Sequence, residues 1–192
     1  MSKFLIAGLG NIGAEYAHTR HNIGFDVLDY FAQKHGAVFQ SDRLADIARI
    51  RFRGKTLLCI KPTTYVNLSG KAVKYWIDKE HIPLENLLVI MDELAIPLEK
   101  LKLKLKGSDA GHNGLKSIQE TLGTQDYARL RFGIGNDYPR GGQVDFVLGR
   151  WRETELPVVR QKVEKCSEVI ENYVVAGPER AMNMVNNLSF GT

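Results

Sequence analysis

Residues 4–13 read FLIAGLGNIG, an apolar run that leads directly into a glycine-rich turn, and this stretch decides the fold. A strand followed by G-x-G-x-x-G is how a dinucleotide-binding fold begins. That fold also needs a helix that starts inside the turn and an acidic residue at the end of the second strand. Here the helical pattern starts only near Arg20, and the next predicted strand ends in Arg51 and Arg53. The sequence thus predicts a strand followed by a tight turn, but it argues against a nicotinamide cofactor.

Strand and helix patterns alternate along the rest of the chain. Apolar residues at helical spacing predict helices, and runs that are wholly apolar or alternate with polar residues predict strands. The predicted helices cover Arg20–His35, Val66–His81, Gly114–Leu122 and about residues 152–187. The predicted strands cover Lys3–Gly8, Asp46–Phe52, Lys55–Lys61, Leu87–Met91, Leu98–Lys106 and Ala128–Ile134. We therefore expect an α/β fold, with a twisted, mixed and largely parallel sheet between helices on both faces, in a single domain of residues 1–192.

The composition is typical of a globular chain, with 44% hydrophobic and 25% charged residues. Lys and Arg exceed Asp and Glu by 26 to 22, which favours an anionic partner only weakly. Cys59 and Cys166 have neither disulfide nor zinc spacing. Because no signal peptide or bilayer-spanning stretch is found, we expect a cytoplasmic protein without a membrane partner.

Polar residues follow the strands at one edge of the predicted sheet, where ligands bind in open α/β folds. These residues are Asn11, Tyr16, His21, Asn67, Asp92, His112 and Asn113. A neutral histidine takes a proton from water, a carboxylate fixes its tautomer, and asparagine amides donate to a carbonyl oxygen that gains charge. No G-x-S-x-G nucleophile elbow is present. The set therefore predicts hydrolysis of an acyl bond by water.

Several of these residues also fit plainer interpretations, which the sequence leaves open. Asn11 could adopt a left-handed conformation in the glycine turn, and Asn113 could cap a helix. His21 could face solvent at a helix start, and Asp92 could cap a turn. His18 and His21 have i, i+3 spacing, but no further ligand nearby in sequence completes a metal shell. We therefore expect no metal site.

Two further segments have distinctive patterns. The predicted strand Leu98–Lys106 ends in a strict alternation of lysine with leucine over residues 100–106. The lysines therefore share one face, as a track for an anionic substrate or as the solvated face of an edge strand. Residues 136–143 are polar and contain Pro139 and the adjacent Gly141 and Gly142. This composition predicts a mobile lid over about residues 136–148.

Six segments resemble bacterial-type peptidyl-tRNA hydrolase, in an order and spacing that are specific and that extend over nearly the whole chain. They are GLGNIGAEYAHTRHNIGF (8–25), KPTTYVNLSGKAV (61–73), Asp92-Glu93-Leu94, GHNGLKSI (111–118), RLRFGIG (129–135) and VDFVLGRW (144–151). The resemblance implies a peptidyl-tRNA hydrolase (phosphorylase/hydrolase-like) fold. It also implies an enzyme that cleaves the ester between a peptide, or an N-blocked aminoacyl group, and the 3′-terminal ribose of tRNA. It further implies a monomer without a cofactor.

The resemblance also implies residue roles. His21 corresponds to the catalytic histidine and Asp92 to the acid that orients it, with an asparagine- or ribose-assisted route as the alternative to histidine as base. Asn11 corresponds to an asparagine that positions substrate and water. Further substrate or tRNA contacts fall on Tyr16, Val66, Asn67, His112, Asn113, Lys102, Lys104 and Arg131.

The chain departs from the family pattern at two positions. Ala110 stands where a glycine is usual before His-Asn-Gly, and a positive φ there would cost alanine about 1 kcal/mol. Val66 stands where methionine is common, and its shorter side chain offers less surface for stacking. Neither departure touches His21 or Asp92.

The basic strand also fits a non-catalytic RNA-binding module, which would not require His21. The chain lacks an RNP1-like aromatic sheet and a KH-type G-x-x-G clamp, so this strand is the only support for that hypothesis.

Overall fold

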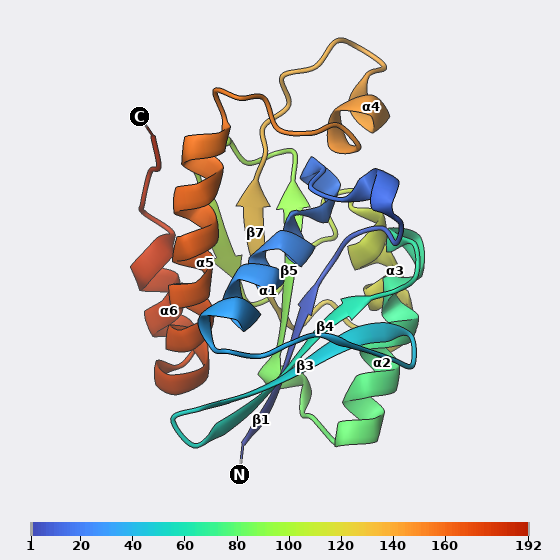
Figure 1. Ribbon diagram of the computed structural model, residues 1–192, viewed down its shortest axis with the longest axis vertical. Helices are drawn as coiled ribbons and strands as arrows, with labels where there is room; N and C mark the ends of the chain where they lie inside the picture. Colours follow the sequence, from blue (N-terminus) through green and yellow to red (C-terminus); the bar gives the residue numbers. More distant parts are fainter. Residues whose placement is uncertain (1, 192) are drawn as a thin grey trace.

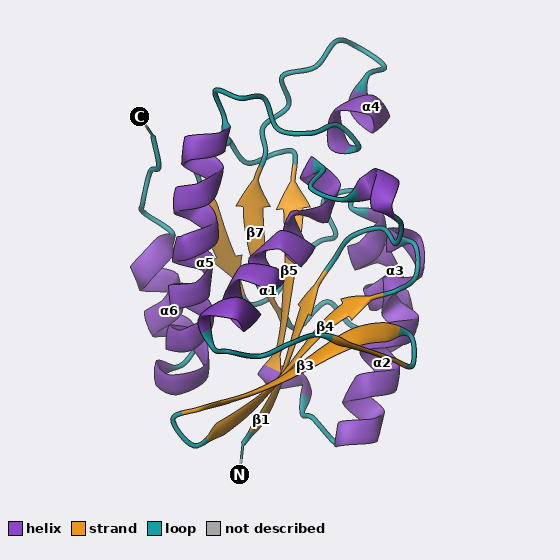
Figure 2. Cartoon of the chain, viewed as in Figure 1, coloured by secondary structure: helices purple, strands orange, loops and turns teal. Residues whose placement is uncertain are grey.

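The computed structural model describes residues 2–191, which form one seven-stranded mixed sheet with helices on both faces (Figures 1 and 2). The strands are β1 (Lys3–Gly8), β2 (Gln40–Asp42), β3 (Ala45–Phe52), β4 (Lys55–Pro62), β5 (Leu87–Glu93), β6 (Leu101–Lys104) and β7 (Ala128–Gly133). The α-helices are α1 (Ile23–Lys34), α2 (Ser69–Glu80), α3 (Asn113–Leu122), α4 (Gln143–Val147), α5 (Leu156–Ala176) and α6 (Pro178–Val185). Short 3-10 turns are η1 (Ala14–Tyr16), η2 (Arg20–Asn22), η3 (Val66–Leu68) and η4 (Leu84–Asn86).

The strand order β2-β3-β4-β1-β5-β7-β6 puts four parallel strands at the centre of the sheet. β4, β1, β5 and β7 run parallel, whereas β2, β3 and β6 pair antiparallel toward the two edges. The carboxyl ends of the central strands therefore meet at one edge of the sheet. In Figure 1 the arrowheads of β5 and β7 point to the end of the molecule that carries α4 and the first 3-10 turns.

Both faces of the sheet are covered, as the alternation along β1 requires. Phe4 and Ile6 pack into the core cluster that includes α1 and α5, while Leu5 and Ala7 pack into the cluster that includes α2 and α3. Figure 2 shows the helices as layers on the two sides of the strands. The predicted α/β architecture with a mixed, largely parallel sheet is confirmed. Among residues 2–191, no helix combines the length and apolarity that crossing a bilayer requires.

The glycine turn after β1 serves close packing of α1. A Cβ on Gly8 would lie 2.3 Å from the carbonyl oxygen of Gly24, and a Cβ on Gly24 would lie 2.5 Å from the backbone nitrogen of Leu9. Both contacts are with backbone, which cannot give way as a flexible side chain does. The two glycines therefore let the first turn of α1 approach the ends of β1 and β5.

Several elements differ from the sequence-based prediction. The helix expected from Arg20 begins as η2 and becomes α1 only at Ile23. The short edge strand β2 was not predicted, because its three residues are polar and exposed on the sheet edge. The segment predicted as a lid contains a short helix, α4. The strand expected over Leu98–Lys106 is limited to β6.

The lysine-rich strand is also less open than its pattern suggests, because the C-terminal segment lies along its edge. Asn186 pairs with both backbone groups of Leu103, accepting from its N–H at 2.7 Å and donating to its carbonyl at 3.0 Å. The Lys102 ammonium donates to the carbonyl of Asn186, and that of Lys100 donates to the carbonyl of Leu188. Leucine and lysine do segregate to opposite faces, but only Lys104 of the lysines in β6 is exposed.

Candidate active site

Three chain segments meet at the carboxyl end of β5. Asp92 lies within β5, His21 lies in η2, and His112 is the residue that precedes α3. His21, Asp92 and His112 line a cleft of about 430 Å³. Tyr138 and Val144 of the lid segment also line this cleft. The parallel strands therefore gather side chains that are far apart in the sequence, as their positions after the strands predict.

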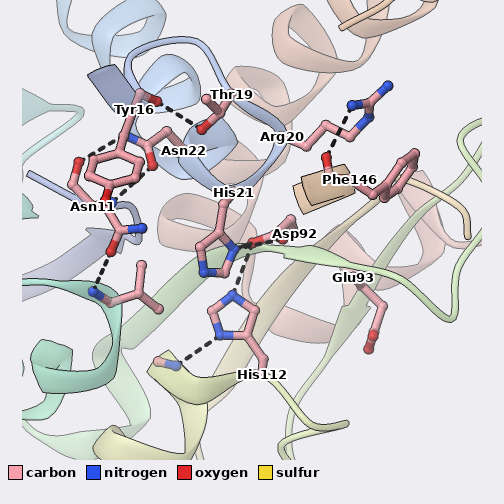
Figure 3. Close-up of polar contacts among 12 residues, drawn as sticks. Asn11, Tyr16, Thr19, Arg20, His21, Asn22, Asp92, Glu93, His112 and Phe146 are labelled. Carbon is pink, nitrogen blue, oxygen red and sulfur yellow. Dashed lines mark hydrogen bonds and ion pairs between the residues drawn. The ribbon is translucent and has the colours of Figure 1, made fainter. Parts of the chain in front are cut away.

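Asp92 is the common partner of the two histidines (Figure 3). Its carboxylate lies 2.9 Å and 3.1 Å from Nδ1 of His21, and 2.9 Å from Nε2 of His112. The Asp92 residue is 3% exposed, so its charge is shielded from water on nearly all sides. A buried carboxylate must be paired and hydrogen-bonded, and the two imidazole N–H groups meet that need.

The tautomer of His112 follows from a backbone contact. The N–H of Gly114 donates to Nδ1 of His112 at 3.0 Å, so Nδ1 must carry a lone pair. The proton of His112 is therefore on Nε2, where it is donated to Asp92. Both ring nitrogens of His112 are engaged in this way. His112 is a fixed donor and has no free nitrogen for proton transfer.

His21 has the opposite arrangement. Its Nδ1–H donates to Asp92, which leaves Nε2 with a lone pair. Nε2 of His21 has no hydrogen bond from the described part of the chain, and the His21 ring is at the wall of the cleft. His21 is thus the histidine of this pair that can accept a proton from a molecule in the cleft.

Opposing effects set the pKa values of this cluster. Burial raises the pKa of Asp92, but its electrostatic interactions and hydrogen bonds with His21 and His112 outweigh burial and hold the pKa well below its usual range. Burial lowers the pKa of His21, but the charge of Asp92 and the hydrogen bond to it outweigh burial, so the pKa is raised. Asp92 therefore stays ionised, and His21 is a stronger base than a free imidazole.

Asn11 is held beside this cluster by a second set of contacts. Its backbone N–H and C=O pair with the side chain of Asn22, each at 2.9 Å. Its side-chain Oδ1 accepts from the backbone N–H of Val66 at 2.8 Å, so Nδ2 is the free end of the amide. In Figure 3 this nitrogen points to the side on which His21 lies. Asn11 can therefore present a fixed hydrogen-bond donor.

His21, Asp92 and His112 also raise the question of a metal, because their possible ligand atoms lie within 4.8 Å of one another. The donor from Gly114 argues against this use, since it forces a proton onto Nε2 of His112, the nitrogen nearest Asp92. A metal ligand needs that lone pair free. The short distances are explained by two N–H groups donating to one carboxylate.

The sequence profile of the family described as peptidyl-tRNA hydrolase matches residues 5–191. The chain belongs to the peptidyl-tRNA hydrolase family. A peptidyl-tRNA hydrolase of Phocaeicola vulgatus is 55% identical over 184 residues, which cover 96% of this chain and 98% of that protein. One of Bacteroides fragilis is 52% identical over the same shares of the two chains. The crystal structure of peptidyl-tRNA hydrolase from Acinetobacter baumannii superimposes with a TM-score of 0.92 at 31% identity, covering 97% of this chain and 95% of that one.

The remaining positions that match the peptidyl-tRNA hydrolase pattern differ in their relation to the cleft. Asn113 is exposed at the start of α3 and lines the cleft, whereas Asn67 is exposed in η3. The side chain that caps α3 belongs to His112, so the interpretation of Asn113 as the cap is wrong. Tyr16 is half-buried, and its ring packs edge-on against Tyr65 with centroids 6.5 Å apart.

Val66 and Arg131 are not placed as the resemblance implies. Val66 is buried, so it contributes the backbone N–H that holds Asn11, not an open surface for stacking. The guanidinium of Arg131 is buried, forms an ion pair of 2.6 Å with Glu93 and donates to the carbonyl of Ser108. A tRNA phosphate cannot reach it in this conformation. The basic positions left for phosphate are Lys104, which is exposed, and Lys102, which is half-buried.

Sequence reasoning missed three buried residues of the site. Arg20 and Asn22 flank His21, and Glu93 follows Asp92. A signal was present for each, because a charged or amide residue directly beside an apolar strand or helix needs a partner when buried. Their partners are distant in the sequence, so the pattern alone could not identify them.

Ala110, at the edge of the cleft, has a φ of 51°. This left-handed conformation costs alanine about 1 kcal/mol, whereas glycine adopts it freely. We expect Ala110→Gly to raise the free energy of unfolding by up to about 1 kcal/mol, since extra freedom in the unfolded chain offsets part of the gain. Urea unfolding of Ala110→Gly and of Ala14→Gly, an exposed control without a positive φ, tests this expectation. Equal destabilisation by both would contradict it.

Proposed function

We propose that this chain hydrolyses the ester between the peptide, or an N-blocked aminoacyl group, and the 3′-terminal ribose of peptidyl-tRNA. The reaction releases free tRNA for reuse in translation. The observation that carries the proposal is the open Nε2 of His21 at the cleft, with the ionised Asp92 bound to the other ring nitrogen. This is the arrangement of a general base for water, in a chain that belongs to the peptidyl-tRNA hydrolase family.

The reaction follows from the proton positions in the cluster. Nε2 of His21 takes a proton from water as the water oxygen attacks the ester carbonyl carbon. The imidazolium that forms is stabilised by Asp92, which remains a carboxylate. When the bond from carbon to the ribose oxygen breaks, the proton on Nε2 passes to that oxygen. The products are a peptide with a free carboxylate and a tRNA with its hydroxyl restored.

The asparagines position the substrate in this scheme. Nδ2 of Asn11 donates to the ester carbonyl as its oxygen gains charge, because the contact with Val66 fixes the amide in that orientation. Asn67 and Asn113 are exposed at helix starts on the same edge of the sheet and can donate to, and accept from, the peptide backbone. Water activation assisted by asparagine or by the ribose is the alternative to His21 as base.

Residues of the lid segment form the opposite wall of the cleft and contact the acyl chain in this proposal. Val144 is 64% exposed, and it lines the cleft together with Tyr138 and Val147. A bound acyl chain would cover this apolar surface. The lid and its closure over the substrate remain a prediction.

The tRNA in this proposal contacts the ring of Tyr16, which packs against Tyr65, and the basic strand β6. Tyr16 lies near the 3′ terminus, and Lys104 and Lys102 bind phosphate groups of the acceptor end, the interactions that make such binding salt-dependent. Action as a monomer in the cytoplasm is part of the proposal as well.

The first test removes the base. We expect His21→Ala to lower the rate of peptide release from an N-blocked aminoacyl-tRNA by about 10²–10⁴-fold, the range for loss of a general base. His81→Asn is the control, because His81 is exposed beyond α2 and asparagine tolerates its φ of 54°. Wild-type turnover in His21→Ala would assign water activation to another group.

The second test uses pH. A general base works unprotonated, so kcat/KM falls as the pH drops through the pKa of His21, which Asp92 raises above its ordinary value. Asp92→Asn removes the charge that raises the pKa of His21, whereas the burial that lowers this pKa remains. We therefore expect the acid limb of the pH profile to move to lower pH while the maximal rate falls. An acid limb that stays in place would show that another group sets it.

The third test concerns the lid. Gly141 has a φ of 81°, which proline cannot adopt because its ring fixes φ near −65°. We expect Gly141→Pro to raise KM or lower kcat for an N-blocked aminoacyl-tRNA. Gly141→Asn keeps the left-handed conformation accessible and is the matched control. Unaltered kinetics in Gly141→Pro would contradict a role of this turn in catalysis.

A further inference from the structure

Arg20 directly precedes the proposed base but its side chain points to the lid segment (Figure 3). The side chain is 5% exposed. Nη2 donates to Oε1 of Glu155 at 2.9 Å, and Nη1 donates to the carbonyl of Phe146 at 3.1 Å. The guanidinium carbon lies 4.1 Å from the centre of the Phe146 ring, in a cation–π contact. Arg20 therefore binds α4 and the start of α5 at the same time.

Backbone hydrogen bonds also join η2 to the end of the lid segment. The N–H of Arg20 donates to the carbonyl of Gly149 at 3.0 Å, and Thr19 forms an antiparallel bridge with Arg150. These bonds do not depend on the side chain at position 20. Loss of the guanidinium would thus leave residues 149 and 150 attached to η2, while Phe146 of α4 would lose its contact with Arg20.

Neighbouring groups restrict where the guanidinium of Arg20 can lie. A Cβ on Gly149 would lie 3.1 Å from Nη1 of Arg20 and 3.0 Å from the carbonyl oxygen of Asp145, so this side of the guanidinium has no spare room. On the other side, Oε1 of Glu155 also accepts the backbone N–H of Arg152 at 2.7 Å. A planar group with several donors fits this site, whereas a lysine ammonium cannot reproduce its fork of contacts.

We propose that Arg20 is a positioning residue that sets the distance between His21 and α4, and so determines how well the acyl chain of the substrate is bound. α4 carries Val144 and Val147, which line the cleft together with His21. Displacement of α4 widens the cleft but leaves the contacts of His21 with Asp92 in place. The inference rests on the proposed function only in taking this cleft as the acyl site.

The proposal predicts that KM depends on the size of the acyl side chain in variants of Arg20. Substrates with a large acyl side chain reach α4 and depend on its position, whereas a glycyl ester is too small to do so. Arg20→Gln should therefore raise KM for N-acetyl-phenylalanyl-tRNA by about 10-fold or more, with a much smaller change for N-acetyl-glycyl-tRNA. The acid limb of the pH profile should stay in place, because Asp92 still sets the pKa of His21.

The experiment compares Arg20→Gln with Arg20→Lys, Glu155→Gln and Arg160→Gln, using both esters and hydrogen exchange of residues 143–149. Arg20→Lys keeps the charge opposite Glu155 and should rescue KM in part. Glu155→Gln keeps an acceptor for Arg20 and gives a milder form of the defect if Arg20→Gln does not fold. Arg160 is exposed on α5, away from the lid segment, so Arg160→Gln is the control and should match the wild type.

Faster exchange in residues 143–149 together with a KM defect confined to the phenylalanyl ester would support the proposal. An equal fall in kcat for both esters, or a shifted acid limb, would overturn it, since Arg20 would then act on His21. Val144→Ala separates this inference from the proposed function. If Val144→Ala leaves KM for both esters unchanged in an active enzyme, the acyl chain does not contact α4. The inference about Arg20 and the proposed acyl contact of the lid then fail, while the proposed ester hydrolysis stands.

Discussion

The site depends on one buried carboxylate. Asp92 is almost completely buried and accepts hydrogen bonds from two imidazole rings. An unpaired charge in this position would be strongly unfavourable, so the residues that satisfy it must be delivered by the fold. β5 brings Asp92, η2 brings His21 and the start of α3 brings His112. The parallel centre of the sheet is what makes these three segments converge.

The two histidines are chemically similar, but the backbone makes them different. The Gly114 N–H occupies one nitrogen of His112, and no described group occupies the outer nitrogen of His21. One carboxylate therefore accepts hydrogen bonds from two imidazole N–H groups, and yet only one ring is left with an available lone pair. A helix start, where N–H groups lack partners within the helix, supplies the donor that creates this asymmetry.

The sequence predicts the sheet and the polar edge well, because apolar periodicity and the position of a residue after a strand are local properties. It places Asp92 and His21 at the same edge without any knowledge of their contacts. It fails where a side chain's partner is distant, as with Arg131 and Glu93. A basic residue in a pattern is available to a ligand only if the fold has not already paired it, and that depends on tertiary packing.

The glycine turn shows how one motif serves different chemistry. In a phosphate-binding turn, backbone N–H groups stay free to contact the ligand. Here the N–H of Leu9 donates to the carbonyl of Ile90, and that of Asn11 donates to the side chain of Asn22. The close approach of Gly24 to Gly8 brings Asn22 to this position. Two N–H groups of the turn are thus used inside the protein, and the turn instead fixes an asparagine amide beside a histidine that can accept a proton.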